Sequence, residues 1–153
     1  MQGEAHALSN FAAMGRVIGI DHGAKRTGLA TTDPLGIIAS ALDTLPTGAV
    51  IDHLQRLHRA EPIEGFVVGL PVDLKGRPTD GTAGALAFME RLRQAFPGLW
   101  VEAVDERFTS TLAQHALRAS GIGRQARRGA AALDRISATI LLQGWIDQRS
   151  RMA

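Results

Sequence analysis

The chain has 153 residues, of which 45% are hydrophobic and 21% are charged, and its formal net charge is +2 at pH 7. These values are typical of one globular domain with a buried core, and they exclude a disordered or fibrous protein. Cysteine is absent, which excludes disulfides and thiolate metal sites, so any bound metal must use oxygen or imidazole ligands.

The N-terminal segment carries no periodic pattern before residue 15. It lacks the basic start and the sustained apolar stretch of a signal peptide. No segment of the chain approaches the roughly 18 consecutive apolar residues of a membrane span. We therefore expect a cytoplasmic protein without a membrane partner. In it, residues 15–150 form the domain, and residues 1–14 are a flexible tail or an over-extended start of the reading frame.

A hairpin over residues 17–30 is the first predicted element. Its first apolar run ends at Asp21, two glycines allow a tight reversal, and a second apolar run follows. Asp21 is therefore a carboxylate at the end of a strand, while Lys25 and Arg26 at the hairpin tip suit an anionic partner. Taken alone, Asp21 is equally well interpreted as an ordinary turn aspartate.

The rest of the chain alternates strands and helices. In order, we predict a third antiparallel strand over 41–45, a helix over 48–60, a strand covered on both faces over 65–71, a helix over 83–96, a strand over 99–104, a helix from about 111 to 121 and a last helix over 130–148. This order predicts an α/β fold with a mixed five-stranded sheet, in which three antiparallel strands precede two parallel ones and helices cover both faces.

Three carboxylates are predicted near one edge of this sheet. Asp21 and Glu106 follow strands at the edge where ligands collect in such folds, and Asp134 lies near the start of the last helix on a small, apolar face. Gathered carboxylates repel one another unless a divalent metal offsets their charge. Mg²⁺ or Mn²⁺ prefers oxygen ligands, and a pair of such ions supports phosphodiester hydrolysis. Asp134 has two alternative interpretations, as the partner of Arg135 or another arginine and as an acid favoured by the helix dipole.

A basic segment without acidic residues separates Glu106 from Asp134. Its cations are Arg107, Arg118, Arg124, Arg127 and Arg128. Such a local excess of guanidinium groups predicts a phosphate-binding surface, and the alternative is a solvated loop that keeps the protein soluble. Arg107 has the further option of pairing with Asp105, which we expect to be structural because neighbours on a strand face opposite sides.

Four segments in this order resemble the YqgF family of RNase H-like proteins. They are Gly19-Ile20-Asp21-x-Gly23 with Thr27-Gly28-Leu29-Ala30, then Val67-Val68-Gly69-Leu70-Pro71, then Asp105-Glu106-Arg107-Phe108-Thr109, and finally Leu133-Asp134 before an alanine-rich apolar helix. The resemblance runs from about Arg16 to Gln148, and members of the family are described as Holliday-junction resolvases or as pre-16S ribosomal RNA nucleases.

The resemblance implies an RNase H-like fold and a nuclease, dependent on Mg²⁺ or Mn²⁺, that acts in pre-16S rRNA 5′-end processing or on branched DNA. Ribosomal assembly intermediates are then candidate partners, and either a monomer or a homodimer fits. By position, Asp21, Glu106 and Asp134 correspond to the catalytic, metal-binding acids. The residues expected to bind nucleic acid are Lys25, Arg26, Arg107, Arg124, Arg127 and Arg128. His22 departs from the family pattern, and we expect it to pack behind the site.

Two other functions compete with a nuclease. Asp21-x-Gly23 followed by Thr27-Gly28 also resembles the phosphate loop of actin-like and sugar-kinase ATPases, although those proteins need far longer chains to enclose a nucleotide. The second competitor is a non-catalytic RNA-binding factor of ribosome assembly, in which the acids are structural and the arginines bind RNA.

Overall fold

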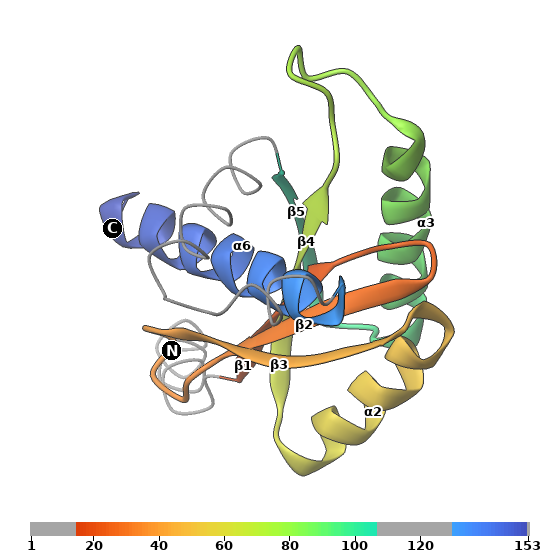
Figure 1. Cartoon of the computed structure of the whole chain (residues 1–153). Coiled ribbons are helices and arrows are strands. Elements are labelled where there is room, and N and C mark those ends of the chain that lie inside the picture. Colours follow the sequence, from red (N-terminus) through yellow and green to blue (C-terminus); the bar gives the residue numbers. More distant parts are fainter. Residues whose placement is uncertain (1–14, 107–129, 153) are drawn as a thin grey trace.

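A twisted five-stranded sheet is the centre of the computed structural model, which describes residues 15–106 and 130–152 (Figure 1). The predicted N-terminal tail and the predicted helix from 111 to 121 lie outside these residues. The strands are β1 (Arg16–Asp21), β2 (Arg26–Thr32), β3 (Ala39–Pro46), β4 (Ile63–Leu70) and β5 (Trp100–Asp105). They are ordered β3-β2-β1-β4-β5 across the sheet.

The pairing of the strands confirms the predicted mixed sheet. β1 pairs with β2 and β2 with β3 in antiparallel orientation, whereas β4 pairs with β1 and β5 in parallel orientation. The carboxyl ends of β1, β4 and β5 therefore lie along one edge, which we call the carboxyl edge. The hairpin between β1 and β2 turns at this edge as well. Asp21 and Glu106 are thus placed at the same edge by topology alone.

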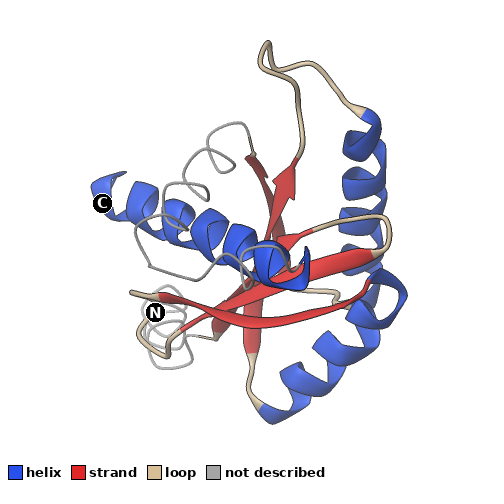
Figure 2. Cartoon of the chain, in the orientation of Figure 1, coloured by secondary structure: helices blue, strands red, loops and turns tan. Residues whose placement is uncertain are grey.

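Helices cover both faces of the sheet (Figure 2). Short helix η1 (Thr47–Ala49) leads into α2 (Val50–Ala60), which shares one face with α3 (Asp80–Ala95), and α6 (Ala130–Met152) covers the other face. No helix in the described part of the chain is long and apolar enough to cross a membrane.

Alternation along the strands supplies a separate core on each side of the sheet. On β4, Phe66 and Val68 are buried against α2 and α3, while Val67 between them is buried against α6. On β1, Ile18 faces the first core and Val17 the second. Apolar residues without alternation therefore identified an interior strand correctly, because both of its faces are covered.

His58, which is half-buried near the end of α2, makes a contact that helical periodicity does not predict. Its Nδ1 accepts a hydrogen bond of 2.9 Å from the backbone N–H of Ile63, and its ring packs edge-on against Phe96 with centroids 6.0 Å apart. Its imidazole therefore ties the end of α2 to the start of β4. The backbone partner lies beyond the end of the helix, so the contact leaves no periodic signal in the sequence.

Two glycines let α6 approach the sheet closely. A Cβ at Gly19 of β1 would lie 2.8 Å from Leu142 Cβ, and a Cβ at Gly28 of β2 would lie 2.1 Å from the backbone oxygen of Asp134. Real Cβ atoms do not come so near to backbone, so any larger residue at position 28 would push α6 away. Gly28 therefore brings the first turns of α6, and Asp134 with them, onto the hairpin that carries Asp21.

We predict that Gly28→Ala destabilises the fold by about 1–3 kcal/mol, because the added methyl group meets helix backbone that cannot rotate aside. Gly144→Ala is the matched control, since nothing lies within 4 Å of a Cβ there. That change should be neutral or stabilise α6 by up to about 1 kcal/mol. Urea unfolding of both variants measures the difference, and equal stabilities would contradict the close packing at Gly28.

Candidate active site

Asp21 ends β1 at a hairpin that is fixed from outside by Thr47. The Thr47 hydroxyl donates a hydrogen bond of 2.6 Å to the carbonyl oxygen of Gly23 and lies 2.8 Å from the buried hydroxyl of Thr27. The backbone N–H of Thr47 donates to the carbonyl oxygen of Lys25 at 3.0 Å. The turn beside Asp21 is therefore rigid. Sequence reasoning missed Thr47, because it follows the hairpin by about twenty residues and belongs to no local pattern.

Glu106 follows β5 and reaches across β4 toward Asp21. Its backbone N–H donates to the carbonyl oxygen of Leu70 at 3.2 Å, which continues the pairing with β4 for one more residue. Its side chain occupies the space above Gly69, where a Cβ would lie 2.1 Å from Glu106 Oε1. Gly69 is therefore a site residue that the sequence analysis included in a motif without giving it a role.

The carboxyl groups of Asp21 and Glu106 form a hydrogen bond with each other. Two carboxyl groups can share such a bond only if one of them is protonated. Burial, the hydrogen bond and the negative charge of Asp21, and finally the charge of Asp105 raise the pKa of Glu106 to about 8. Burial also raises the pKa of Asp21, whereas the hydrogen bond from Glu106 lowers it. Burial raises the pKa of both groups, so the Asp21–Glu106 pair retains one shared proton near neutral pH.

Asp134 approaches this pair from the first turns of α6. Its negative charge contributes to the raised pKa of Asp21, so the two groups interact. On its other side, Asp134 Oδ2 lies 3.5 Å from Nε of Arg26. Burial raises the pKa of Asp134, and the charge and hydrogen bond of Arg26 oppose that shift.

The three predicted acids thus gather at one place without forming a closed cluster. Asp21 and Glu106 are in contact, and Asp134 interacts with Asp21 while it is held by Arg26. Within residues 15–106 and 130–152, no three acidic or imidazole groups are arranged closely enough to hold a metal ion as they stand. An arginine does pair with Asp134, as one of the alternatives predicted. That arginine is Arg26, and the ion pair lies beside the two carboxyl groups of Asp21 and Glu106.

His22 lies behind the site against α3. Its ring is 5.0 Å from the ring of Phe88, and the missing side chain of Gly84 leaves room for it, since a Cβ there would lie 3.3 Å from His22 Cε1. Burial and then the positive charge of Arg91 lower the pKa of His22, so its imidazole is neutral at pH 7. This position agrees with the predicted packing role.

The residues predicted to bind nucleic acid are described only in part. Lys25 is exposed at the hairpin tip, and the Arg26 side chain is 49% exposed while it contacts Asp134. Arg107, Arg124, Arg127 and Arg128 lie outside the described residues. The cations that the structure does place therefore flank the carboxyl groups at the carboxyl edge.

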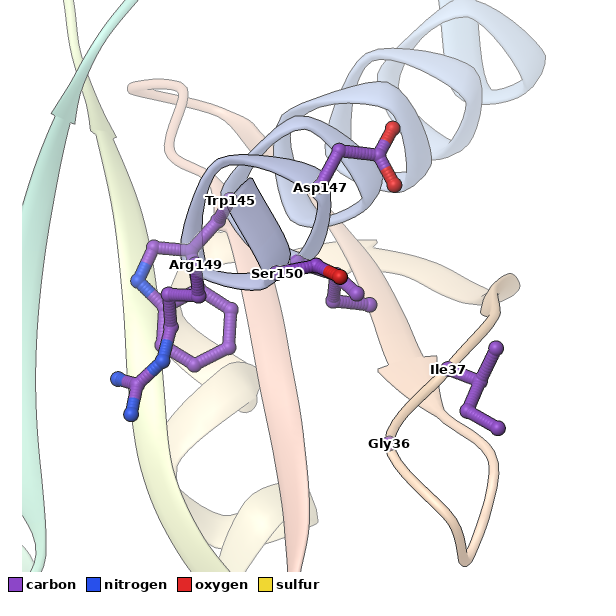
Figure 3. Close-up of a pocket in the computed structure, with 7 residues that line it drawn as sticks. Gly36, Ile37, Trp145, Asp147, Arg149 and Ser150 are labelled. Atoms are coloured by element: carbon purple, nitrogen blue, oxygen red, sulfur yellow. The ribbon is translucent and has the colours of Figure 1, made fainter. Parts of the chain in front are cut away.

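A cavity of about 420 Å³ lies at the other end of α6 and is lined by residues that include Gly36, Trp145 and Arg149 (Figure 3). Trp145 follows Asp134 by eleven residues, which corresponds to about 16 Å along a helix. Its described lining contains Asp147 but none of the three acids Asp21, Glu106 and Asp134. The cavity is therefore separate from the candidate active site.

Comparison with known proteins assigns the chain to a family. The model of the RuvX family, described as Holliday junction resolvase, matches residues 15–148. The chain belongs to this family. RuvX is the family also called YqgF, so the resemblance predicted from the four motifs is confirmed. The matched range includes Asp21, Glu106 and Asp134.

Curated relatives match the chain over nearly their whole length. A protein of Porphyromonas gingivalis named "Putative pre-16S rRNA nuclease" is 44% identical over 138 residues, which cover 90% of this chain and 100% of the relative. A protein of Amoebophilus asiaticus with the same name is 41% identical, and the match covers 90% of this chain and 98% of the relative.

Among solved structures, RuvC of Thermus thermophilus in complex with a Holliday junction substrate is similar in fold. The TM-score is 0.57 at 20% sequence identity, and the match covers 91% of this chain and 98% of that one. This similarity confirms the predicted RNase H-like α/β fold.

We predict that the metal-free protein loses stability as the pH rises from about 4.5 to about 8. The folded state raises the pKa of Glu106 from 4.5 to about 8, so it keeps a proton that the unfolded chain has released. This contribution is complete below about pH 4.5 and is lost as the pH rises through 8, with a slope of up to about 1.4 kcal/mol per pH unit. Urea unfolding in the presence of EDTA measures it. In Glu106→Gln the slope should be shallower, and parallel curves for the two proteins would refute the shared proton.

Proposed function

We propose that this protein is a nuclease that hydrolyses phosphodiester bonds with the help of Mg²⁺ or Mn²⁺, and that its substrate is the 5′ region of pre-16S ribosomal RNA. The observation that supports this proposal is the buried, hydrogen-bonded pair of Asp21 and Glu106 with Asp134 beside it. The relatives from Porphyromonas and Amoebophilus, which carry the rRNA nuclease name, support the choice of substrate.

The chemistry of the side chains fits a hard divalent cation. Every candidate ligand is a carboxylate oxygen, as Mg²⁺ and Mn²⁺ prefer. The carboxyl pair already needs one positive charge to stay together, and a proton on Glu106 meets that need in the metal-free protein. Asp21, Glu106 and Asp134 would hold the metal. Two bound ions would activate a water molecule and stabilise the leaving oxygen.

The chain's own groups would perform the other tasks. The Asp21–Glu106 pair would release its proton to solvent if a divalent cation bound, because metal ligands must be deprotonated. Thr47 keeps the β1–β2 hairpin rigid, which fixes the direction of Asp21. Lys25 at the hairpin tip is exposed and suits a phosphate group of the substrate backbone.

Branched DNA is the second candidate substrate, because the matching family is described as Holliday junction resolvase. A four-way junction presents two equivalent strands, so this function suits a homodimer with two sites, whereas trimming of RNA ends suits a monomer. We propose a cytoplasmic location for either function. Comparison of a precursor rRNA fragment and a four-way DNA junction under the same conditions decides between them.

We predict that the purified protein cleaves a precursor 16S rRNA fragment in the presence of Mn²⁺ or Mg²⁺, and that Asp21→Asn reduces the rate more than about 100-fold, which exceeds the usual loss for groups that only support metal ligands. The same variant should still bind the RNA, because the substitution removes no positively charged side chain. Gel analysis of cleavage and filter binding of the RNA measure the two effects.

Asp33→Asn is the matched control for this substitution. Asp33 lies in the turn between β2 and β3 at the opposite edge of the sheet, and its Oδ1 accepts hydrogen bonds from the N–H groups of Ile37 and Ile38. An asparagine oxygen accepts the same bonds, so cleavage should be unchanged. A wild-type protein that binds RNA but never cuts it would favour the non-catalytic assembly factor.

We further predict that Arg127→Ala combined with Arg128→Ala weakens RNA binding and reduces the salt slope of the binding constant by about two, because each lost phosphate contact removes about one unit. Arg56→Ala combined with Arg59→Ala is the charge-matched control on the exposed side of α2, and it should leave the slope unchanged. Binding titrations at several salt concentrations measure both, and equal slopes for wild type and the first variant would refute the phosphate contacts.

A further inference from the structure

The contact between Arg26 and Asp134 occupies the third carboxylate of the candidate metal site. Arg26 Nε is 3.5 Å from Asp134 Oδ2, and the two side chains are 49% and 27% exposed. Asp134 also interacts with Asp21, so the guanidinium group lies at the border of the site and not remote from it. A divalent cation on Asp134 would compete with Arg26 for Oδ2 and would repel the positive charge of the guanidinium group.

We propose that Arg26 is a positioning residue that holds Asp134 in the metal-free protein and is transferred to a phosphate of the substrate when Asp134 binds metal. This inference rests on the proposed function and adds a mechanism of coupling to it. The half-exposed guanidinium is able to leave, because an ion pair this close to solvent is weak. A phosphate group offers Arg26 a partner of equal or higher charge.

The consequence is that metal and nucleic acid assist each other. Substrate binding removes the competitor of the metal from Asp134, and metal binding frees Arg26 for the substrate. Coupling between two ligands is reciprocal, so each must raise the affinity of the other by the same factor. Before either ligand binds, the Asp21–Glu106 hydrogen bond and the weak ion pair between Arg26 and Asp134 stand in place of a complete metal site.

Mn²⁺ binding to the full chain tests this inference without any cleavage. The electron paramagnetic resonance signal of free Mn²⁺ reports the dissociation constant, with and without a 2′-O-methyl oligoribonucleotide that keeps natural phosphates. In wild type, we expect the oligoribonucleotide to tighten Mn²⁺ binding roughly threefold or more. In Arg26→Gln, Mn²⁺ should bind roughly threefold or more tightly than in wild type without nucleic acid, and the additional tightening by the oligoribonucleotide should be lost.

Lys25→Gln is the matched control. It removes one positive charge from the same hairpin tip, and none of the described residues forms an ion pair with Lys25. This variant should bind the oligoribonucleotide more weakly but keep the Mn²⁺ affinity of the free protein and the coupling. Arg26→Lys retains the charge and should behave like wild type, which separates the loss of charge from a local change of shape.

The outcomes separate this inference from the proposed function. If Arg26→Gln weakens Mn²⁺ binding or leaves it unchanged, then Arg26 only supports Asp134, and the transfer is refuted while the metal site stands. If Lys25→Gln abolishes the coupling to the same extent, general attraction of Mn²⁺ to the nucleic acid explains it, and the inference is again refuted. If wild type binds no Mn²⁺ under either condition, the metal site and the transfer both fail.

Discussion

The burial of two carboxyl groups against each other is the constraint on which the site depends. Asp21 and Glu106 come from strands that are not neighbours, since β4 lies between them. Their side chains meet because Gly69 of β4 leaves open the space that a side chain would fill. Such a pair is unstable when both groups are charged, so it must contain a proton or a cation. This requirement for a compensating positive charge is the property on which the proposed metal site rests.

The same principle of close approach governs the third acid. Gly28 has no side chain, so the backbone of Asp134 packs directly against β2. This close contact fixes the position of the start of α6. Asp134 is therefore placed by packing of backbone on backbone, and the orientation of its side chain depends on charge. In the metal-free protein, Arg26 supplies that charge. The fold thus determines where Asp134 lies, and the charge of Arg26 offsets part of the cost of burying its carboxylate.

Backbone and side-chain hydrogen bonds hold the segments that carry the acids at the carboxyl edge. The β1–β2 hairpin is tied to η1 by three interactions of Thr47, and Glu106 extends the pairing of β5 with β4 beyond the last strand residue. His22 fills the space toward α3 as a neutral ring. Each acid is therefore held by strand or helix backbone, which is the arrangement that a hydrolytic site needs to keep its ligands in register.

The sequence by itself determined the order of the described strands and of the helices α2, α3 and α6, the mixed sheet and the family. Hydrophobic patterns report burial along one segment, so β4 was identified as an interior strand and β1–β2 as a hairpin, and the motifs placed two acids at strand ends. Patterns of this kind do not report which atoms of different segments meet. The proton shared by Asp21 and Glu106, the hold of Arg26 on Asp134, the support from Thr47 and the contact of His58 with β4 were therefore decided by the tertiary structure, because each depends on distances between segments that only the packed sheet and helices fix.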